Sequence, residues 1–150
     1  MPKQHKQHKL LFPILSFLWV IVILSFSLQD GSRSSLQSGM ITTTIQSLLA
    51  SMGIEIEQQF LSFLIRKGAH FTEFFILGLF IKQSSNDTQN KLFLYLGFLV
   101  PILDETLQSF IPGRAMAVTD MMIDWVGILF GVFVLIGFHR INKNHQNLEK

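Results

Sequence analysis

The sequence contains no cysteine, and charged residues make up only 15% of its 150 residues. The absence of cysteine excludes disulfide bonds, thiolate nucleophiles and cysteine-ligated zinc. Charge is also scarce, because a soluble domain usually carries roughly 25% charged residues. Hydrophobic residues reach 49% and include 15 Phe. Since a soluble protein of this length would lack the polar surface to cover so many apolar side chains, the composition predicts a single membrane domain.

Basic residues are concentrated at the ends of the apolar segments. Lys3, Lys6 and Lys9 precede the first segment, and no aromatic residue is interleaved with them. This distribution is typical of membrane proteins rather than of nucleic-acid-binding surfaces. We therefore predict membrane lipids as partners and no nucleic acid.

Four apolar segments are about long enough to cross a bilayer, which takes roughly 20 residues. They predict an all-α fold, a four-helix transmembrane bundle, with helices at about 10–28, 58–82, 91–110 and 120–139. The connection 29–57 is rich in Ser, Thr and Gln. We interpret it as an external loop that contains a short surface helix near 45–52, although an unstructured linker fits the composition equally well.

The distribution of Lys and Arg predicts the orientation of the bundle. These residues are most frequent in the N-terminal segment, in the link 82–91 and in the C-terminal tail. Cytoplasmic flanks of membrane helices carry the excess of positive charge. The expected topology is therefore N-in/C-in in the cell membrane, with both termini cytoplasmic.

Polar side chains interrupt three of the predicted helices at similar depths. Counted at 1.5 Å per residue from the cytoplasmic ends, they lie about 12–27 Å into a hydrocarbon core about 30 Å thick. On each helix they recur at spacings of three or four residues and so share one face. A charge at the centre of a span costs roughly 2.5–3.5 kcal/mol when it is left unpaired.

We therefore predict that these groups converge on a water-accessible site in the outer half of the membrane. The ten candidate ligand-binding residues are Arg66, Lys67, His70, Glu73, Asp104, Glu105, Gln108, Arg114, Asp120 and Asp124. The alternative interpretation is a set of buried ion pairs that only fixes the register of the helices.

Two ordered motifs resemble those of the VanZ-like family of membrane proteins. The first is K-x-x-H-x-x-E from Lys67 to Glu73, followed by Leu77-Gly78. The second begins with D-E-x-x-Q at Asp104 and continues through P-G-R at 112–114 and Asp120 to Gly127. Together they cover about residues 66–131. Asp124 departs from the pattern, because the family often has Asn at that position.

The resemblance implies an integral membrane protein of the cell envelope. The family is known for members linked to teicoplanin-type glycopeptide antibiotic resistance, and it implies no established reaction. The first hypothesis is that Arg66, Lys67 and Arg114 bind a lipid-linked or anionic envelope component at the outer leaflet.

The alternative hypothesis is a membrane-embedded hydrolase of a lipid phosphate. Its candidate catalytic residues are His70, Glu73, Asp104 and Glu105, which could bind a divalent metal or act as acid and base. The sequence supports no firm assignment of a resident metal or cofactor. A third hypothesis, an ion-coupled flippase component, would require a homo-oligomer, because the inner half of every span is apolar.

Overall fold

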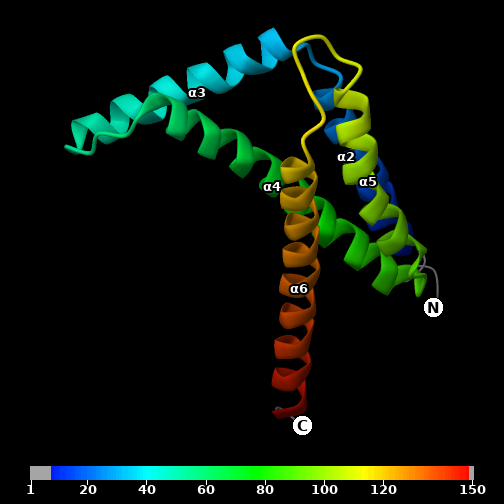
Figure 1. The fold of residues 1–150 in the computed structure, drawn as a ribbon. Helices are drawn as coiled ribbons and strands as arrows, with labels where there is room; N and C mark the ends of the chain where they lie inside the picture. The colour runs from blue at the N-terminus through cyan, green and yellow to red at the C-terminus, as the bar shows by residue number, and fades with distance from the viewer. Residues whose placement is uncertain (1–7, 149–150) are drawn as a thin grey trace.

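The computed structural model describes residues 8–148, and that part of the chain is helical with no strand. Its elements are the short 3-10 turn η1 (His8–Leu10) and the helices α2 (Leu11–Ser27), α3 (Gly31–Ser51), α4 (Gln58–Thr88), α5 (Leu92–Gln108) and α6 (Val118–Leu148). Helix α4 crosses α6 and packs against every other helix (Figure 1). The predicted all-α class is therefore confirmed.

The helices differ in how well they meet the requirements for crossing a bilayer. Within the described residues, α6 is the one helix that is both long and apolar enough to cross alone. The pair α2 and α3 meets the same criteria jointly, but it is bent by 101°. Helices α2 and α5 have 17 residues each. At 1.5 Å per residue their length is about 25 Å, which is shorter than a hydrocarbon core about 30 Å thick. Four spans and the N-in/C-in topology therefore stay predictions.

Helix α3 occupies most of the segment that was predicted to be a loop with a short helix. Its 21 residues begin after Asp30, whose side chain accepts a hydrogen bond of 2.8 Å from the Ser32 N–H. This backbone hydrogen bond lowers the pKa of the Asp30 carboxyl. The hydroxyls of α3 bond to carbonyls in the preceding turn, as Thr42 does to Ser38 at 2.7 Å. These bonds satisfy the hydroxyls of a helix that is rich in Ser and Thr, residues of low helix propensity.

Helix α4 continues past the end predicted for it. Residues 82–88 of the polar stretch that was expected to form a link are its last two turns or so, and the chain turns only at residues 89–91. Gln89 ends the helix with a φ of 57°. The serines of this stretch are buried, and Ser84 Oγ lies 2.9 Å from Ser16 Oγ of α2. The composition suggested a solvated loop, but the Ser84 hydroxyl is satisfied inside the bundle, where it also bonds to the Phe80 carbonyl at 2.7 Å.

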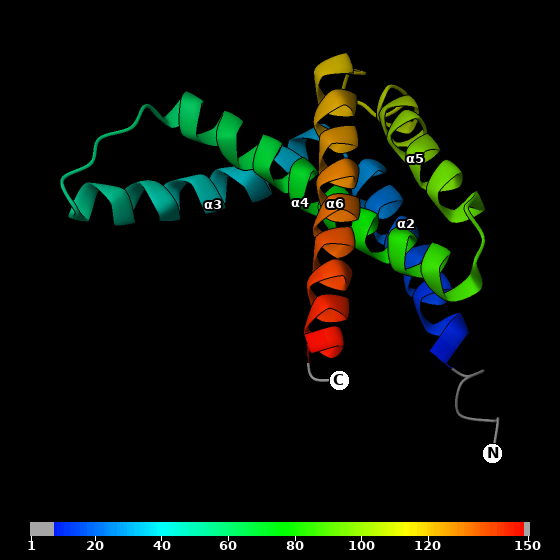
Figure 2. The same cartoon turned by 90° about the horizontal axis from the view of Figure 1, so that it is seen from below.

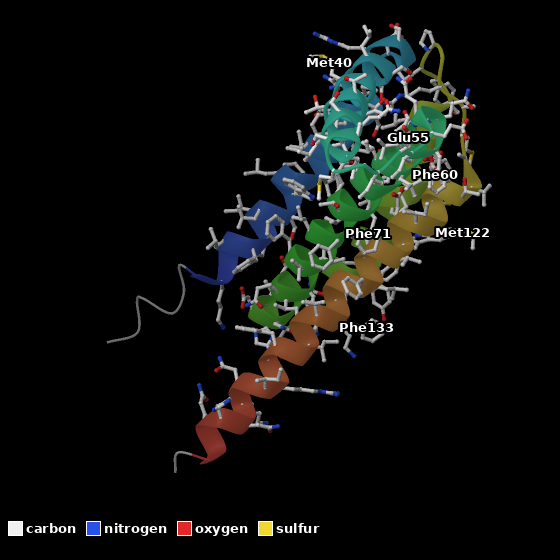
Figure 3. The ribbon with its side chains drawn as sticks, turned by 90° about the vertical axis from the view of Figure 1, so that its left-hand side faces the viewer. Met40, Glu55, Phe60, Phe71, Met122 and Phe133 are labelled. Carbon is white, nitrogen blue, oxygen red and sulfur yellow. The ribbon has the colours of Figure 1, made fainter. Side chains whose placement is uncertain are left out.

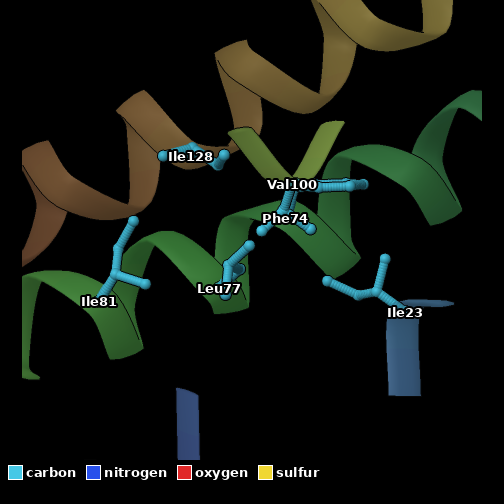
Figure 4. Packing of buried hydrophobic residues seen from close by; sticks show 6 residues of the cluster. All are labelled: Ile23, Phe74, Leu77, Ile81, Val100 and Ile128. Carbon is cyan, nitrogen blue, oxygen red and sulfur yellow. The ribbon is translucent and has the colours of Figure 1, made fainter. Parts of the chain in front are cut away.

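The apolar core lies where α2, α4, α5 and α6 meet. Figure 4 shows its six buried side chains: Ile23, Phe74, Leu77, Ile81, Val100 and Ile128. Three of them belong to α4, so this helix forms the centre of the packing. Figures 1 and 2 both show α3 and the first half of α4 extending together to one side of this core.

Three glycines bring the backbones of α4 and α6 into contact. A Cβ atom built on Gly127 would lie 2.7 Å from the carbonyl oxygen of Phe71. One built on Gly131 would meet the carbonyl of Phe75, and one on Gly78 would meet that of Ile128. Because no larger residue fits without movement of the backbone, these glycines fix the spacing of the two helices.

Outside the apolar core, the distribution of polarity differs from that of a soluble protein. Large apolar side chains point outward along the helices, among them Phe60, Met122 and Phe133 (Figure 3), which are 54%, 58% and 64% exposed. The interior, in contrast, contains buried carboxylates, including Asp104 and Glu105. Exposed apolar side chains together with buried carboxylates are the arrangement that lipid as a solvent favours.

Candidate functional site

A cavity of about 460 Å³ lies where α2 ends, α3 begins and the chain turns between α5 and α6. Eight of the ten predicted ligand-binding residues line it: Arg66, Lys67, His70, Glu73, Asp104, Gln108, Arg114 and Asp120. The other two, Glu105 and Asp124, are fully buried. Side chains from α4, α5 and α6 therefore converge, as their depth and spacing predicted.

Two polar side-chain contacts join α4 to α6 at this site. Lys67 pairs with Asp120. One turn further along both helices, His70 Nδ1 lies 3.2 Å from Asp124 Oδ1. Lys67 and His70 are three residues apart and so share one face of α4. Asp120 and Asp124 are four residues apart and share one face of α6. The two contacts therefore lie one after the other along the same pair of helix faces.

The two carboxylates of α5 are held by hydrogen bonds to neutral groups. Asp104 accepts hydrogen bonds from the Ser27 hydroxyl of α2 and, at 2.8 Å, from Gln108 Nε2. Glu105 Oε2 accepts a hydrogen bond of 2.6 Å from the backbone N–H of Ala117, in the turn before α6. These donors fix the direction of both buried carboxylates.

Four side chains form a compact group beside the cavity. The nearest ligand-type atoms of His70, Asp104, Glu105 and Asp124 all lie within 4.8 Å of one another. Within residues 8–148, no hydrogen-bond donor reaches Glu105 Oε1 or Asp124 Oδ2, although both atoms are buried. We call these four residues the carboxylate–histidine cluster. Buried polar atoms are normally satisfied, so the two unpaired oxygens require an explanation.

Glu73 was predicted as a candidate catalytic residue, and it lies at the cavity rather than in the cluster. Its side chain lines the cavity and is half-buried. Its backbone carbonyl accepts a hydrogen bond of 2.9 Å from Trp19 Nε1 of α2. The cluster therefore contains three of the four predicted catalytic candidates, with Asp124 in the place of Glu73.

The two arginines of the site differ from Lys67 in their pairing. Arg66 and Arg114 both line the cavity. Among the described residues, neither forms an ion pair with a carboxylate. The alternative interpretation, a set of buried ion pairs that only fixes helix register, therefore does not account for these two arginines, which have no carboxylate partner within residues 8–148.

Sequence reasoning missed the contributions of α2 and α3 to the site. Ser27 bonds to Asp104, and Ser34, Ser35 and Ser38 of α3 line the cavity. The available signal was the Asp30-Gly31-Ser32 start, since Asp is a preferred N-cap residue. The N–H of Gly31 also donates a hydrogen bond of 3.1 Å to the Pro112 carbonyl, which holds the start of α3 against the turn after α5.

The fold and the site define a class of protein: a helical membrane-associated protein with an apolar exterior and a charged interior cavity. The sequence profile of the VanZ/LLP1 family matches residues 12–139, which is most of the chain. The chain therefore belongs to the VanZ/LLP1 family, as its two motifs indicated. No curated protein and no solved structure matches it. Membership of this membrane-associated family supports a general role in the cell envelope.

Proposed function

We propose that this protein is a multi-pass membrane protein whose cavity binds an anionic group of an envelope lipid or lipid-linked precursor at the outer leaflet. The proposal includes the N-in/C-in topology, with both termini cytoplasmic. In that topology the end of the bundle that contains the cavity would lie near the external headgroups. The observation that carries the proposal is the presence of Arg66, Lys67 and Arg114 around one cavity.

The chemistry of the lining suits a phosphate or carboxylate. A guanidinium group binds either anion in a bidentate manner, whereas a lysine acts as a point charge. Serines of α3 in the lining add neutral hydrogen-bonding groups. A volume of about 460 Å³ is within the range of roughly 300–1,000 Å³ that small-molecule sites occupy.

The three cations of the cavity differ in whether a carboxylate already pairs with them. Lys67 is paired with Asp120, so an incoming anion would compete with this carboxylate for the ammonium group. Arg66 and Arg114 have no such competitor among the described residues. We therefore assign the first contact with the ligand to the arginines and the closing contact to Lys67.

A binding experiment tests this assignment directly. The protein is purified in detergent, reconstituted in nanodiscs of phosphatidylcholine containing phosphatidylglycerol, and its bound lipids are identified by native mass spectrometry. We expect retention of the anionic lipid, and at least about tenfold weaker retention in Arg114→Ala, as loss of a charged hydrogen bond of roughly 1.5–3 kcal/mol implies. Arg33→Ala is the matched control, because Arg33 lies on α3 outside the cavity lining. Equal retention by all three proteins would refute the proposal.

We further propose that the protein contributes to teicoplanin-type resistance by binding an envelope precursor. Bacteria that express the protein should need more teicoplanin for growth inhibition than bacteria that do not. Lys67→Ala should abolish the difference while the variant still inserts in the membrane. Full protection by an inserted Lys67→Ala variant would contradict this part of the proposal.

The alternative function, hydrolysis of a lipid phosphate, is favoured by one feature. His70 and Asp104 both line the cavity and belong to the carboxylate–histidine cluster, so acid–base groups adjoin the place where an anion would bind. Release of phosphate from a lipid phosphate by the parent protein, and its loss in His70→Ala, would identify this activity. Binding without release would leave the binding function alone.

A further inference from the structure

We propose that the carboxylate–histidine cluster is a binding site for one divalent transition-metal ion, such as Zn²⁺ or Mn²⁺. The site would join α4, α5 and α6 inside the bundle through His70, Asp104, Glu105 and Asp124. The inference goes beyond the proposed anion binding and does not depend on it, since the arginines and Lys67 are not among the four ligands.

The spacing of the four groups is close to that of ligands on one ion. Metal–nitrogen and metal–oxygen bonds of about 2.0–2.2 Å place neighbouring ligand atoms roughly 3.4 Å apart in a tetrahedral site. His70 Nδ1 and Asp124 Oδ1 are 3.2 Å apart. All four ligand-type atoms lie within 4.8 Å of one another, so a contraction of at most about 1.4 Å would bring every pair to the tetrahedral distance.

The two unpaired oxygens are the independent evidence for a ligand. Within the described chain, Glu105 Oε1 and Asp124 Oδ2 are buried without a donor, and both side chains are 0% exposed. An unsatisfied buried polar group costs about 1–3 kcal/mol, and more when it is charged. A cation among the four ligands would supply the missing partner for both carboxylates and would neutralise two of their negative charges.

The surrounding hydrogen bonds resemble the outer shell of a metal site. Ser27 and Gln108 hold Asp104, and the N–H of Ala117 holds Oε2 of Glu105. Donors of this kind orient ligating carboxylates and leave the other lone pairs for the ion. If the cluster only fixed helix register, we would expect the donors to satisfy both oxygens of each carboxylate.

The ligand types indicate which ions fit. Imidazole suits zinc, iron and copper, and carboxylates suit manganese and magnesium. One histidine with three carboxylates therefore favours a borderline divalent ion over calcium, which takes oxygen ligands only. The protein contains no cysteine, so no thiolate competes for the ion.

Metal analysis of the full-length protein, purified in detergent without chelator, tests the site. We expect about one Zn²⁺ or Mn²⁺ per chain, removal by EDTA, and restoration with a raised Tm when either ion is added back, since a ligand that binds only the folded state stabilises it. Glu105→Gln and Asp124→Asn should each weaken ion binding at least about tenfold. Asp120→Asn is the matched control, one turn away on α6, and it should retain the ion.

Three results separate the possible outcomes. Circular dichroism and gel filtration show whether the variants fold. If they do not fold, the metal content of the parent protein before and after EDTA treatment is the test. Should the parent bind neither ion, or should Asp120→Asn lose the ion as fully as Asp124→Asn, the metal site is refuted. Lipid retention measured on EDTA-treated protein tests anion binding separately, so that either inference can fail without the other.

Discussion

The contact between α4 and α6 has two halves that are built differently. In the first, polar side chains bridge the helices, with Lys67 paired to Asp120 and His70 hydrogen-bonded to Asp124. In the second, Gly127 and Gly131 let the backbones touch. Helices in lipid lack a hydrophobic drive to associate, so they depend on close packing of small residues and on interhelical polar bonds. This pair of helices uses both, one after the other along the same interface.

The difference indicates a division of roles. The glycine half sets the distance and register of the two helices, because contact with a backbone carbonyl leaves no room for adjustment. The polar half uses that register to place carboxylates opposite His70 and around a cavity. Changes in the glycine half should therefore affect stability most, whereas changes in the polar half should affect binding.

The largest effect is expected when a methyl group is added in the glycine half. Gly131→Ala should destabilise the protein by about 1–3 kcal/mol, because the added Cβ meets the Phe75 carbonyl and overpacking has costs of this size. Gly137→Ala is the control on the same helix, since a Cβ there has nothing within 4 Å. Equilibrium unfolding in mixed detergent micelles measures both. Equal stability of the two variants would show that the helices do not touch at Gly131.

The next effect concerns the ion pair of the polar half. A double-mutant cycle with Lys67→Ala and Asp120→Ala should give a coupling free energy of about 1 kcal/mol, within the range of roughly 0.5–3 kcal/mol for residues in contact. Both side chains are about one-fifth exposed, so screening keeps the value modest. Additive single effects would mean that the two residues do not interact.

A smaller effect is expected at the hydrogen bond between α2 and α5. Ser27→Ala removes the hydroxyl that bonds to Asp104, and interhelical hydrogen bonds in membrane proteins average about 0.6 kcal/mol. Ser25→Ala should change nothing measurable, because that hydroxyl is exposed and bonds only within its own helix. The same unfolding measurement compares the two, and a greater loss for Ser25→Ala would contradict the assignment.

The smallest effect is confined to the start of α3. The folded pKa of Asp30 is lowered by the Ser32 N–H, so the cap is complete above the ordinary carboxyl pKa and is lost as the pH falls through the lowered value. The Ser32 amide proton resonance should shift over that acid range. In Asp30→Asn, whose side chain does not titrate, the resonance should stay constant, and a shift there would assign the change to another group.

The sequence was sufficient to predict the convergence of α4, α5 and α6 because lipid makes isolated charges costly. Helical spacing and depth then specified one face on each helix. The wall formed by α3 was not predicted, because Ser and Thr have low helix propensity and their bonds to the preceding turn cannot be read from composition. The closeness of Gly127 to Phe71 was also missed, because a glycine in a helix does not specify which backbone approaches it.

Crosslinking inside the folded protein tests the central claim, that α4 and α6 meet at the positions of Lys67 and Asp120. Because the chain contains no cysteine, Lys67→Cys and Asp120→Cys can be joined selectively by a short bifunctional thiol reagent. A protease site introduced in the turn at 89–91 then separates α4 from α6. The fragments should stay covalently joined, whereas those of a Lys67→Cys, Gly137→Cys control, about 25 Å further along α6, should separate. Separation of the fragments in both proteins would contradict the account.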